Sequence, residues 1–272
     1  MQSIAAKTGD PRLNYANLLI EDHDAVRSIT VNRPDKLNAL NHATIGELQH
    51  AFDAARSDTG VRVVVLTGAG AKAFVAGADI GEFANATPVQ ARDFSEAGQR
   101  MMRTVETLGK PVVARVNGFA LGGGMELAMC CHLRIAADTA KLGTPEINLG
   151  ILPGFGGTQR LTRLTGRAAA LELCLLGAPI GAERAFQLGI VNRVVPAAEL
   201  DAEVRKLATQ LARSAPHALR AILDAVIFGG DMALDQGLSY ETHLFATTAS
   251  TEDMREGTRA FLEKRAAVFR GS

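Results

Sequence analysis

The sequence of 272 residues contains no tryptophan, only two tyrosines and three cysteines, and no surplus of either charge. Its 29 Lys and Arg residues balance 29 Asp and Glu residues, so the basic excess typical of a nucleic-acid-binding protein is missing. No apolar run approaches the roughly 18 residues of a membrane span. The first ten residues also lack the apolar region of a secretory signal. We therefore expect a cytoplasmic protein that binds neither nucleic acid nor a membrane.

The cysteines and histidines show no arrangement typical of a metal site. Cys130, Cys131 and Cys174 are odd in number and lack CxxC spacing, so we expect buried free thiols rather than disulfides or zinc ligands. The histidines are interpreted as surface or structural residues, because no two of them have ligand spacing. They lie at positions 23, 42, 50, 132, 217 and 243. Neither a metal ion nor a redox cofactor is expected.

Glycine, in contrast, is abundant, with 27 residues or about 10% of the chain against an average near 7%. A hydrophobic content of 47% argues against disorder and provides for a large core. One glycine-rich turn, GAGAKA (68–73), is similar to a dinucleotide-binding motif. An apolar stretch follows this turn, whereas pyrophosphate binding needs the start of a helix there. The pattern therefore disfavours a nicotinamide-dependent dehydrogenase.

Strand and helix patterns alternate over most of the chain, which predicts an α/β fold. Strands are expected over residues 17–22, 26–32, 61–68, 111–116, 132–138 and 189–195. Helices are expected from about 41, from 87 to 108 after a capping box, beyond the glycines 122–124, over 157–165, and through most of the chain from 197 onward. Pro196 is the best candidate for a boundary, which divides the chain into a core of residues 1–195 and a helical region of residues 196–272.

Glycines and carboxylates together mark the most distinctive segment. Gly122, Gly123 and Gly124 precede a helix, whose unpaired N–H groups suit a developing oxyanion. Glu126 lies in the first turn of that helix, and Glu146 follows in a second apolar stretch. Each glutamate alone would be interpreted as a solvated or capping residue, but their joint occurrence beside the glycines favours acid–base chemistry. Two carboxyl groups whose pKa values are driven apart can act as base and acid in one addition.

Six ordered blocks give the sequence a family resemblance. They are RPDKLNAL (33–40), KAFVAGADI (72–80), KPVVARVNGFALGGGMELAM (110–129), TPEINLGILPGFGGTQRL (144–161), GIVNRVV (189–195) and GTRAFLEKR (257–265). Over about residues 15–270 the sequence resembles the crotonase (enoyl-CoA hydratase/isomerase) superfamily, and within it the short-chain enoyl-CoA hydratases. The resemblance implies a crotonase-like α/β spiral of ββα units. It also implies C-terminal helices that assemble a homo-oligomer, either a trimer or a dimer of trimers.

The resemblance carries catalytic roles over to five positions of this chain. The N–H groups of Ala78 and Gly123 would form the oxyanion hole for the thioester oxygen of an acyl-CoA. Glu126 would help to activate the water, Glu146 would deliver a proton to C2, and Gly154 would help to position the water. The roles of the two glutamates are coupled and hard to separate.

The resemblance also implies residues that bind coenzyme A, which is part of the substrate rather than a cofactor. These residues are Lys36, Leu37, Ala39, Ala76, Asp79, Ile80 and Gly122. Phe261 and Lys264 match C-terminal positions that reach the CoA of a neighbouring subunit. Val75 and Met125 replace the smaller Ala and Cys often found there, which leaves the acyl-chain preference open.

The expected function is the reversible syn addition of water to trans-2-enoyl-CoA, giving 3-hydroxyacyl-CoA in fatty-acid β-oxidation or related acyl-CoA catabolism. Isomerases and thioester hydrolases of the superfamily typically lack one glutamate, so isomerisation and other lyase or hydrolase activities are kept as alternatives. An RNA-binding relative would carry a lysine-rich helix, whereas the helix expected over 41–57 has no lysine. A purely structural oligomer would have no use for paired glutamates.

Overall fold

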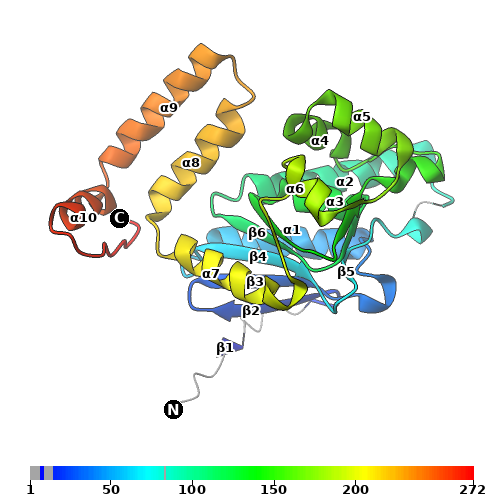
Figure 1. The fold of residues 1–272 in the computed structure, drawn as a ribbon, viewed down its shortest axis with the longest axis horizontal. Helices are drawn as coiled ribbons and strands as arrows, with labels where there is room; N and C mark the ends of the chain where they lie inside the picture. The colour runs from blue at the N-terminus through cyan, green and yellow to red at the C-terminus, as the bar shows by residue number, and fades with distance from the viewer. Residues whose placement is uncertain (1–6, 9–14, 83) are drawn as a thin grey trace.

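A computed structural model of the chain describes residues 7–8, 15–82 and 84–272 (Figure 1). The larger of its two sheets contains, in spatial order, β1 (Lys7–Thr8), β2 (Leu18–His23), β3 (Val26–Val31), β4 (Val63–Gly68), β6 (Val112–Val116), β8 (Leu133–Ala137) and β11 (Arg193–Val195). The smaller sheet contains β10 (Ile180–Gly181), β9 (Lys141–Gly143), β7 (Phe119–Leu121) and β5 (Ala73–Val75). Neighbouring strands run parallel from β3 to β11 and from β5 to β9.

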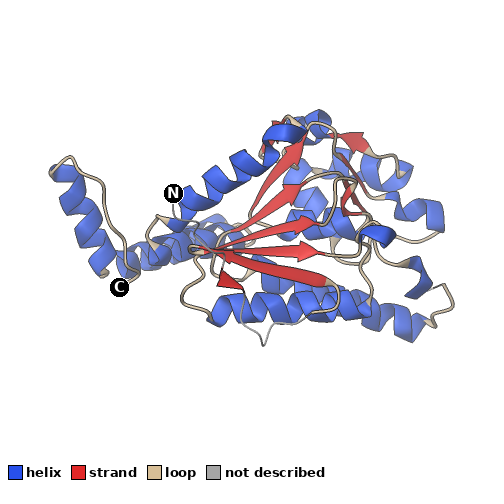
Figure 2. Cartoon of the chain, turned by 90° about the horizontal axis from the view of Figure 1, so that it is seen from below, coloured by secondary structure: helices blue, strands red, loops and turns tan. Residues whose placement is uncertain are grey.

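Helices connect and cover these sheets. The α-helices are α1 (His42–Ser57), α2 (Pro88–Glu106), α3 (Gly123–Cys130), α4 (Gly157–Thr165), α5 (Arg167–Leu176), α6 (Ala182–Gln187), α7 (Leu200–Ala212), α8 (Pro216–Gly229), α9 (Leu234–Ala249) and α10 (Glu252–Leu262). The short 3₁₀ turns are η1 (Pro34–Lys36), η2 (Ile80–Glu82), η3 (Pro145–Leu149) and η4 (Ala197–Glu199). Figure 2 shows helices on both sides of the fanned larger sheet.

The predicted spiral of ββα units is confirmed by the order of the elements. In β4–β5–α2, β6–β7–α3 and β8–β9–η3–α4, the first strand joins the larger sheet and the second joins the smaller sheet. A long crossover is required because the strands of successive units pair in parallel. Each unit therefore brings a strand-to-helix turn to the same region of the molecule, between the smaller sheet and helices α2 to α4.

Both faces of the larger sheet are buried at β4, β6 and β8, which explains the nearly continuous apolar sequence of these strands. On one face the main core includes Leu48 and Phe52 of α1, Met101 and Met102 of α2, and Leu127 of α3. On the opposite face α7 packs its apolar side chains against alternate residues of the sheet. This second cluster contains Val63, Val65, Val113, Ile135, Leu200, Val204, Leu207 and Ala208.

The C-terminal helices leave this core after α7. Figure 1 shows α8 and α9 as an antiparallel pair that projects away from the sheets, with α10 beside the C-terminus. Arg62 links the C-terminal segment to the core. Its guanidinium donates to the Ala212 carbonyl at the end of α7 at 3.1 Å and to the Phe269 carbonyl at 3.0 Å. The boundary placed between residues 195 and 196 stays a prediction, although α7, which follows it, packs on the same sheet as the preceding strands.

Most predicted elements are confirmed, and the differences lie at their ends. The capping box of α2 is present, with Thr87 and Gln90 each bonded to the other's backbone N–H. The expected end at residue 108 is wrong by two residues, because the chain leaves the helix before Gly109, whose φ is +76°. The strand expected over 189–195 is confined to Arg193–Val195, since Ile190 donates back to the carbonyl of Ala185 at the end of α6.

All three cysteines are free thiols, as predicted, with Cys130 and Cys131 buried and Cys174 half-buried. No helix within residues 15–82 and 84–272 combines the length and the apolar character needed to cross a bilayer. The prediction about a secretory signal concerns residues 1–10, which lie outside the described residues except for Lys7–Thr8.

Candidate active site

The glycines at the start of α3 are required by space and by backbone geometry. Gly122 has φ +51°, a conformation that L side chains rarely adopt. A Cβ on Gly124 would lie 1.8 Å from the carbonyl oxygen of Val75, so the helix could not approach β5 with any other residue there. Every residue of α3 is buried. The helix start is thus held rigidly against the smaller sheet.

A second backbone segment is held beside Gly123. Leu40 donates to the carbonyl of Gly77 at 2.9 Å and accepts from the N–H of Asp79 at 2.7 Å, which fixes Ala78 between them. The Ala78 nitrogen lies 3.4 Å from the position that a Cβ on Gly123 would occupy. Within the described part of the chain, the N–H groups of Ala78 and Gly123 donate to no acceptor. Two adjacent, fixed and unpaired donors can stabilise a negatively charged oxygen.

Glu126 is a buried carboxyl group bound by a loop of the chain. Its side chain is 1% exposed, and its Oε1 accepts from the N–H of Phe155 at 2.8 Å and from the N–H of Gly157 at 2.6 Å. Burial, together with the nearby Glu146 carboxylate, raises the pKa of Glu126 to about 8, although the two N–H groups and Arg160 act in the opposite direction. Because Oε1 is occupied by two donors, a proton on this carboxyl group belongs on Oε2.

Glu146 lies on η3 and is 9% exposed. Its Oε2 is buried and has no hydrogen-bond partner within the described residues. Burial raises the pKa of Glu146, and its own backbone N–H lowers it. Both values rise, because both carboxyl groups are taken out of water, and that of Glu126 rises to about 8.

Both glutamates line one cavity of about 580 Å³. Eight of the predicted site residues line it together: Ala76, Ala78, Ile80, Gly122, Gly123, Glu126, Glu146 and Gly154. The remaining lining residues are Gly77, Ala91, Phe94, Ser95, Pro145, Leu149, Gly150, Ile151, Leu152 and Phe155. Sequence reasoning missed Ala91, Phe94 and Ser95, whose spacing along α2 places them on one helix face and could have identified them.

Apart from the C-terminal Phe261 and Lys264, four of the expected coenzyme A residues lie outside the cavity lining: Lys36, Leu37, Ala39 and Asp79. The chain nevertheless places them beside it. The carbonyl of Leu37 accepts from the N–H of Ala76 at 3.0 Å, and Arg33 bridges the carbonyl of Ala39 at 2.5 Å and the carboxylate of Asp79 at 3.0 Å. These contacts align the segment after η1 with the strand end that carries Ala78.

Asn38 locks this segment and was not recognised from the sequence. It is 1% exposed and has φ +61°. Its Oδ1 accepts from the N–H of Arg33 at 3.0 Å, and its Nδ2 donates to the carbonyls of Ala69 and Ala73 at 3.0 and 2.9 Å. A buried amide whose groups are all paired rigidly orients the backbone around it.

Phe261 and Lys264 are not brought to the cavity. Phe261 is 82% exposed near the end of α10, and Lys264 follows the helix with φ +55°. Figure 1 shows α10 beyond α8, on the far side of the molecule from α3 and α4. Within one chain these two residues therefore take no part in the site.

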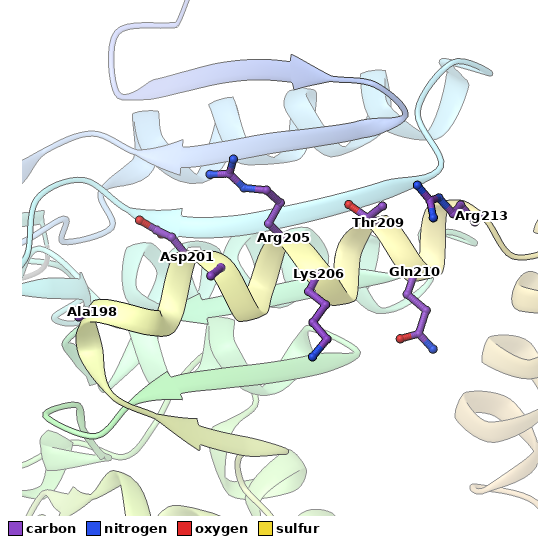
Figure 3. Close-up of a pocket in the computed structure, with 8 residues that line it drawn as sticks. Ala198, Asp201, Arg205, Lys206, Thr209, Gln210 and Arg213 are labelled. Atoms are coloured by element: carbon purple, nitrogen blue, oxygen red, sulfur yellow. The ribbon is translucent and has the colours of Figure 1, made fainter.

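A second hollow lies elsewhere on the molecule and contains none of the predicted residues. It measures about 870 Å³ and runs along the outer face of α7. Figure 3 shows mainly polar and charged side chains along that single helix, among them Arg205, Lys206, Gln210 and Arg213. The one carboxyl group that lines it, that of Asp201, is exposed, so the cavity at Glu126 is the candidate active site.

The fold and the cavity agree with one family of proteins. The chain matches the model of the enoyl-CoA hydratase/isomerase family over residues 21–272 and belongs to that family. It is 45% identical to the crotonyl-CoA hydratase of Syntrophomonas wolfei subsp. wolfei, over 94% of this chain and 98% of that protein. It is 43% identical to the short-chain-enoyl-CoA hydratase of Clostridium acetobutylicum, over 92% of this chain and 95% of that protein.

Solved structures agree with this relationship. The crystal structure of an enoyl-CoA hydratase from Bacillus anthracis is 40% identical to this chain and superposes with a TM-score of 0.91, covering 94% of this chain and all of the other. A structure of an enoyl-CoA hydratase subunit from Geobacillus kaustophilus is 43% identical, with a TM-score of 0.90, over 95% of this chain and 99% of that one. The crotonase-like fold is thereby confirmed.

Proposed function

We propose that this chain is an enoyl-CoA hydratase, which adds water reversibly to trans-2-enoyl-CoA and gives 3-hydroxyacyl-CoA. The observation that carries the proposal is the presence of two buried carboxyl groups, Glu126 and Glu146, in one cavity beside the unpaired N–H groups of Ala78 and Gly123. The names of its relatives support the same activity. Retention of both glutamates favours hydration over the isomerisation and thioester hydrolysis that other members carry out.

The two N–H groups account for activation of the thioester. When water attacks C3, negative charge moves through the conjugated system to the thioester oxygen. Donors from Ala78 and Gly123 hold that oxygen without rearrangement, because Leu40 and the packing of Gly124 fix their backbones. The acyl group then lies in the cavity, whose wall includes the apolar side chains of Phe94 and Leu149.

The two carboxyl groups account for proton transfer. Addition of water needs a base for the oxygen that joins C3 and an acid for C2, so the active pair carries one proton between its two members. The pKa of Glu126 places that proton on Glu126 in the unliganded site near neutral pH. Activation of water by Glu126 then requires that this proton passes to Glu146 through the bound water. Gly154 lines the same cavity, and we assign its backbone the role of helping to position that water. No metal ion or redox cofactor enters this scheme.

The oligomer forms part of the proposal. Helices α8 and α9 expose large apolar side chains, including Val226 at 69%, Leu234 at 75% and Phe245 at 74%. Such a surface favours burial against further copies of the chain, in a trimer or a dimer of trimers. A neighbouring copy would then bring Phe261 and Lys264 to the coenzyme A. The cytoplasmic location and the catabolic pathway stay predictions.

The proposal is tested with purified protein and crotonyl-CoA, by following the ultraviolet absorbance of the conjugated thioester. We expect Glu126→Gln and Glu146→Gln each to lower kcat by about 10²–10⁴. Both variants should still bind butyryl-CoA, a saturated analogue, in calorimetric titrations. Absence of hydration by the wild-type protein across several acyl lengths would overturn the activity. Near-full activity of either variant would overturn the role of that residue.

A further inference from the structure

The loop of residues 154–157 determines the environment of Glu126, but its own sequence gives it little rigidity. It supplies both backbone donors to Glu126 Oε1, from Phe155 and from Gly157. Gly156 between them has φ +100°. Three of its four residues are glycines, which have more backbone freedom than any other residue. Contacts from outside the loop must therefore hold it in place.

Arg160 holds the loop from the first turns of α4. Its Nη1 donates to the carbonyl of Phe155 at 2.7 Å, so Phe155 is bound by Arg160 through its C=O and by Glu126 through its N–H. The same Nη1 lies 2.4 Å from the position of a Cβ on Gly156, and a side chain at Gly156 would displace it. The Arg160 side chain is 16% exposed and does not line the cavity.

Glu106, the last residue of α2, fixes Arg160 in turn. The two side chains form a bidentate pair, with Nε to Oε1 at 2.5 Å and Nη2 to Oε2 at 3.1 Å. A fork-to-fork pair of this kind sets the plane of the guanidinium as well as its distance. Glu106 is anchored by His132, whose Nε2 donates to the Glu106 carbonyl at 3.0 Å while its Nδ1 accepts from Val112 at 2.8 Å. Burial lowers the pKa of His132, which fits this neutral form.

We infer that Arg160, oriented by Glu106, is a positioning residue for hydration: it holds the 154–157 loop against Glu126 and supplies the positive charge that keeps this carboxyl group able to ionise. The inference rests on the proposed function, because it concerns the same carboxyl group. Arg160 acts through the loop and through its electric field, and it touches neither the water nor the acyl group.

The charges around Glu126 determine the sign of the expected effect. Glu146 on η3 and Arg160 on α4 act on it directly. Glu106 at the end of α2 is paired with Arg160 and acts on Glu126 through that pair. The thiols of Cys130 and Cys174 also lie near, and burial raises the pKa of both, so they are uncharged at neutral pH. Arg160 lowers the pKa of Glu126, whereas a second cation, Arg103 of α2, pairs with Glu106 at 3.4 Å. Removal of Arg160 should therefore raise that pKa, and neutralisation of Glu106 should lower it.

Four variants separate charge from shape. Arg160→Gln removes the charge, and Arg160→Lys keeps the charge but loses the planar fork. Glu106→Gln keeps an oxygen that can accept from Arg160 but removes the opposing charge. Arg163→Gln is the matched control, because Arg163 lies on the same helix, is 60% exposed and pairs with Asp231 instead. Thermal unfolding of every variant is measured alongside, so that loss of folding is recognised.

Two measurements are made on each variant. The first is the titration of the protonated-carboxyl band in the infrared spectrum, assigned to Glu126 by its loss in Glu126→Gln, which needs no catalysis. The second is the pH profile of kcat/KM with crotonyl-CoA. We expect Arg160→Gln to move both midpoints up by about one pH unit, and Glu106→Gln to move them down. Arg160→Lys should leave the midpoints near the wild-type values but lower kcat about tenfold, with butyryl-CoA binding retained. Arg163→Gln should change nothing.

The outcomes are distinguishable. Midpoints that stay fixed in Arg160→Gln and Glu106→Gln, or that move in the same direction in both, overturn the inference. If Arg160→Gln does not fold, the downward shift in Glu106→Gln decides the question alone. A wild-type protein that hydrates no enoyl-CoA refutes the proposed function, whereas the infrared shifts still test whether Arg160 controls Glu126.

Discussion

Glu126 should destabilise the folded chain at neutral pH, and Glu126→Gln should therefore be more stable than the wild type. Folding raises the pKa of this carboxyl group from 4.5 to about 8. Between these values the folded state binds more protons than the unfolded state, so the free energy of unfolding falls as pH rises through this window. This decrease in the free energy of unfolding is absent below about pH 4.5 and reaches its full size above about pH 8.

The magnitude follows from the size of the shift. At about 1.4 kcal/mol per pH unit, the ionisation of Glu126 lowers the free energy of unfolding by roughly 3 kcal/mol at pH 7 and by about 5 kcal/mol above pH 8. An amide cannot ionise, yet its oxygen can still accept from the N–H groups of Phe155 and Gly157. The free energy of unfolding of the variant should therefore equal that of the wild type with Glu126 protonated, and it should not fall as the pH rises.

The assay is thermal unfolding of wild type and Glu126→Gln at several pH values. Near pH 5 the melting temperatures of the two proteins should be close. At pH 8 the melting temperature of the variant should be higher by at least about 5 °C, because that of a large domain shifts by roughly 2–4 °C per kcal/mol. Glu172→Gln, at an exposed position on α5, is the matched control and should show no such trend. A difference that does not grow between pH 5 and pH 8 would refute the argument from burial.

Two further substitutions test how the backbone supports the site. Gly122→Ala forces a side chain into φ +51° and places its Cβ 2.9 Å from Glu146 Oε1, so we expect lower kcat and a loss of about 1–2 kcal/mol in stability. Gly166→Ala is the control. It introduces the same kind of backbone strain, at φ +79°, but its Cβ meets no neighbouring atom, so kcat should be unchanged. Asn38→Ala removes the side chain that bonds to the N–H of Arg33 and to the carbonyls of Ala69 and Ala73. We expect kinetic assays to show a raised KM. Urea unfolding should show a stability lower by about 2 kcal/mol.

The sequence predicts the fold well because local patterns encode it. The capping box at Thr87 and the strand at Val63–Gly68 depend on residues close in the chain, and both are confirmed. Likewise, the convergence of the segments that carry Glu126 and Glu146 follows from repeated ββα units, since each repeat returns its helix start to one region. Family resemblance then identifies which of the buried carboxyl groups share a cavity.

Groups that join distant segments could not be predicted. Arg160 stands in the sequence as an ordinary helix arginine, and nothing local indicates that Glu106 meets it from another helix. Asn38 has the appearance of a turn residue, and its burial arises only when Ala69 and Ala73 close over it. The sequence alone also gives no direction for the pKa of Glu146, because the removal of its carboxyl group from water depends on tertiary packing.

The surplus of glycine has a cause that composition alone does not reveal. Turns account for part of it, but several glycines allow backbones to meet where no Cβ could fit. A Cβ on Gly118 would lie 2.2 Å from the carbonyl oxygen of Lys72, and one on Gly98 would lie 2.3 Å from the ring of Phe155. The second contact reaches the site, since Phe155 donates its N–H to Glu126. A larger residue at Gly98, on the buried face of α2, would therefore displace the loop whose N–H groups bind the Glu126 carboxyl group.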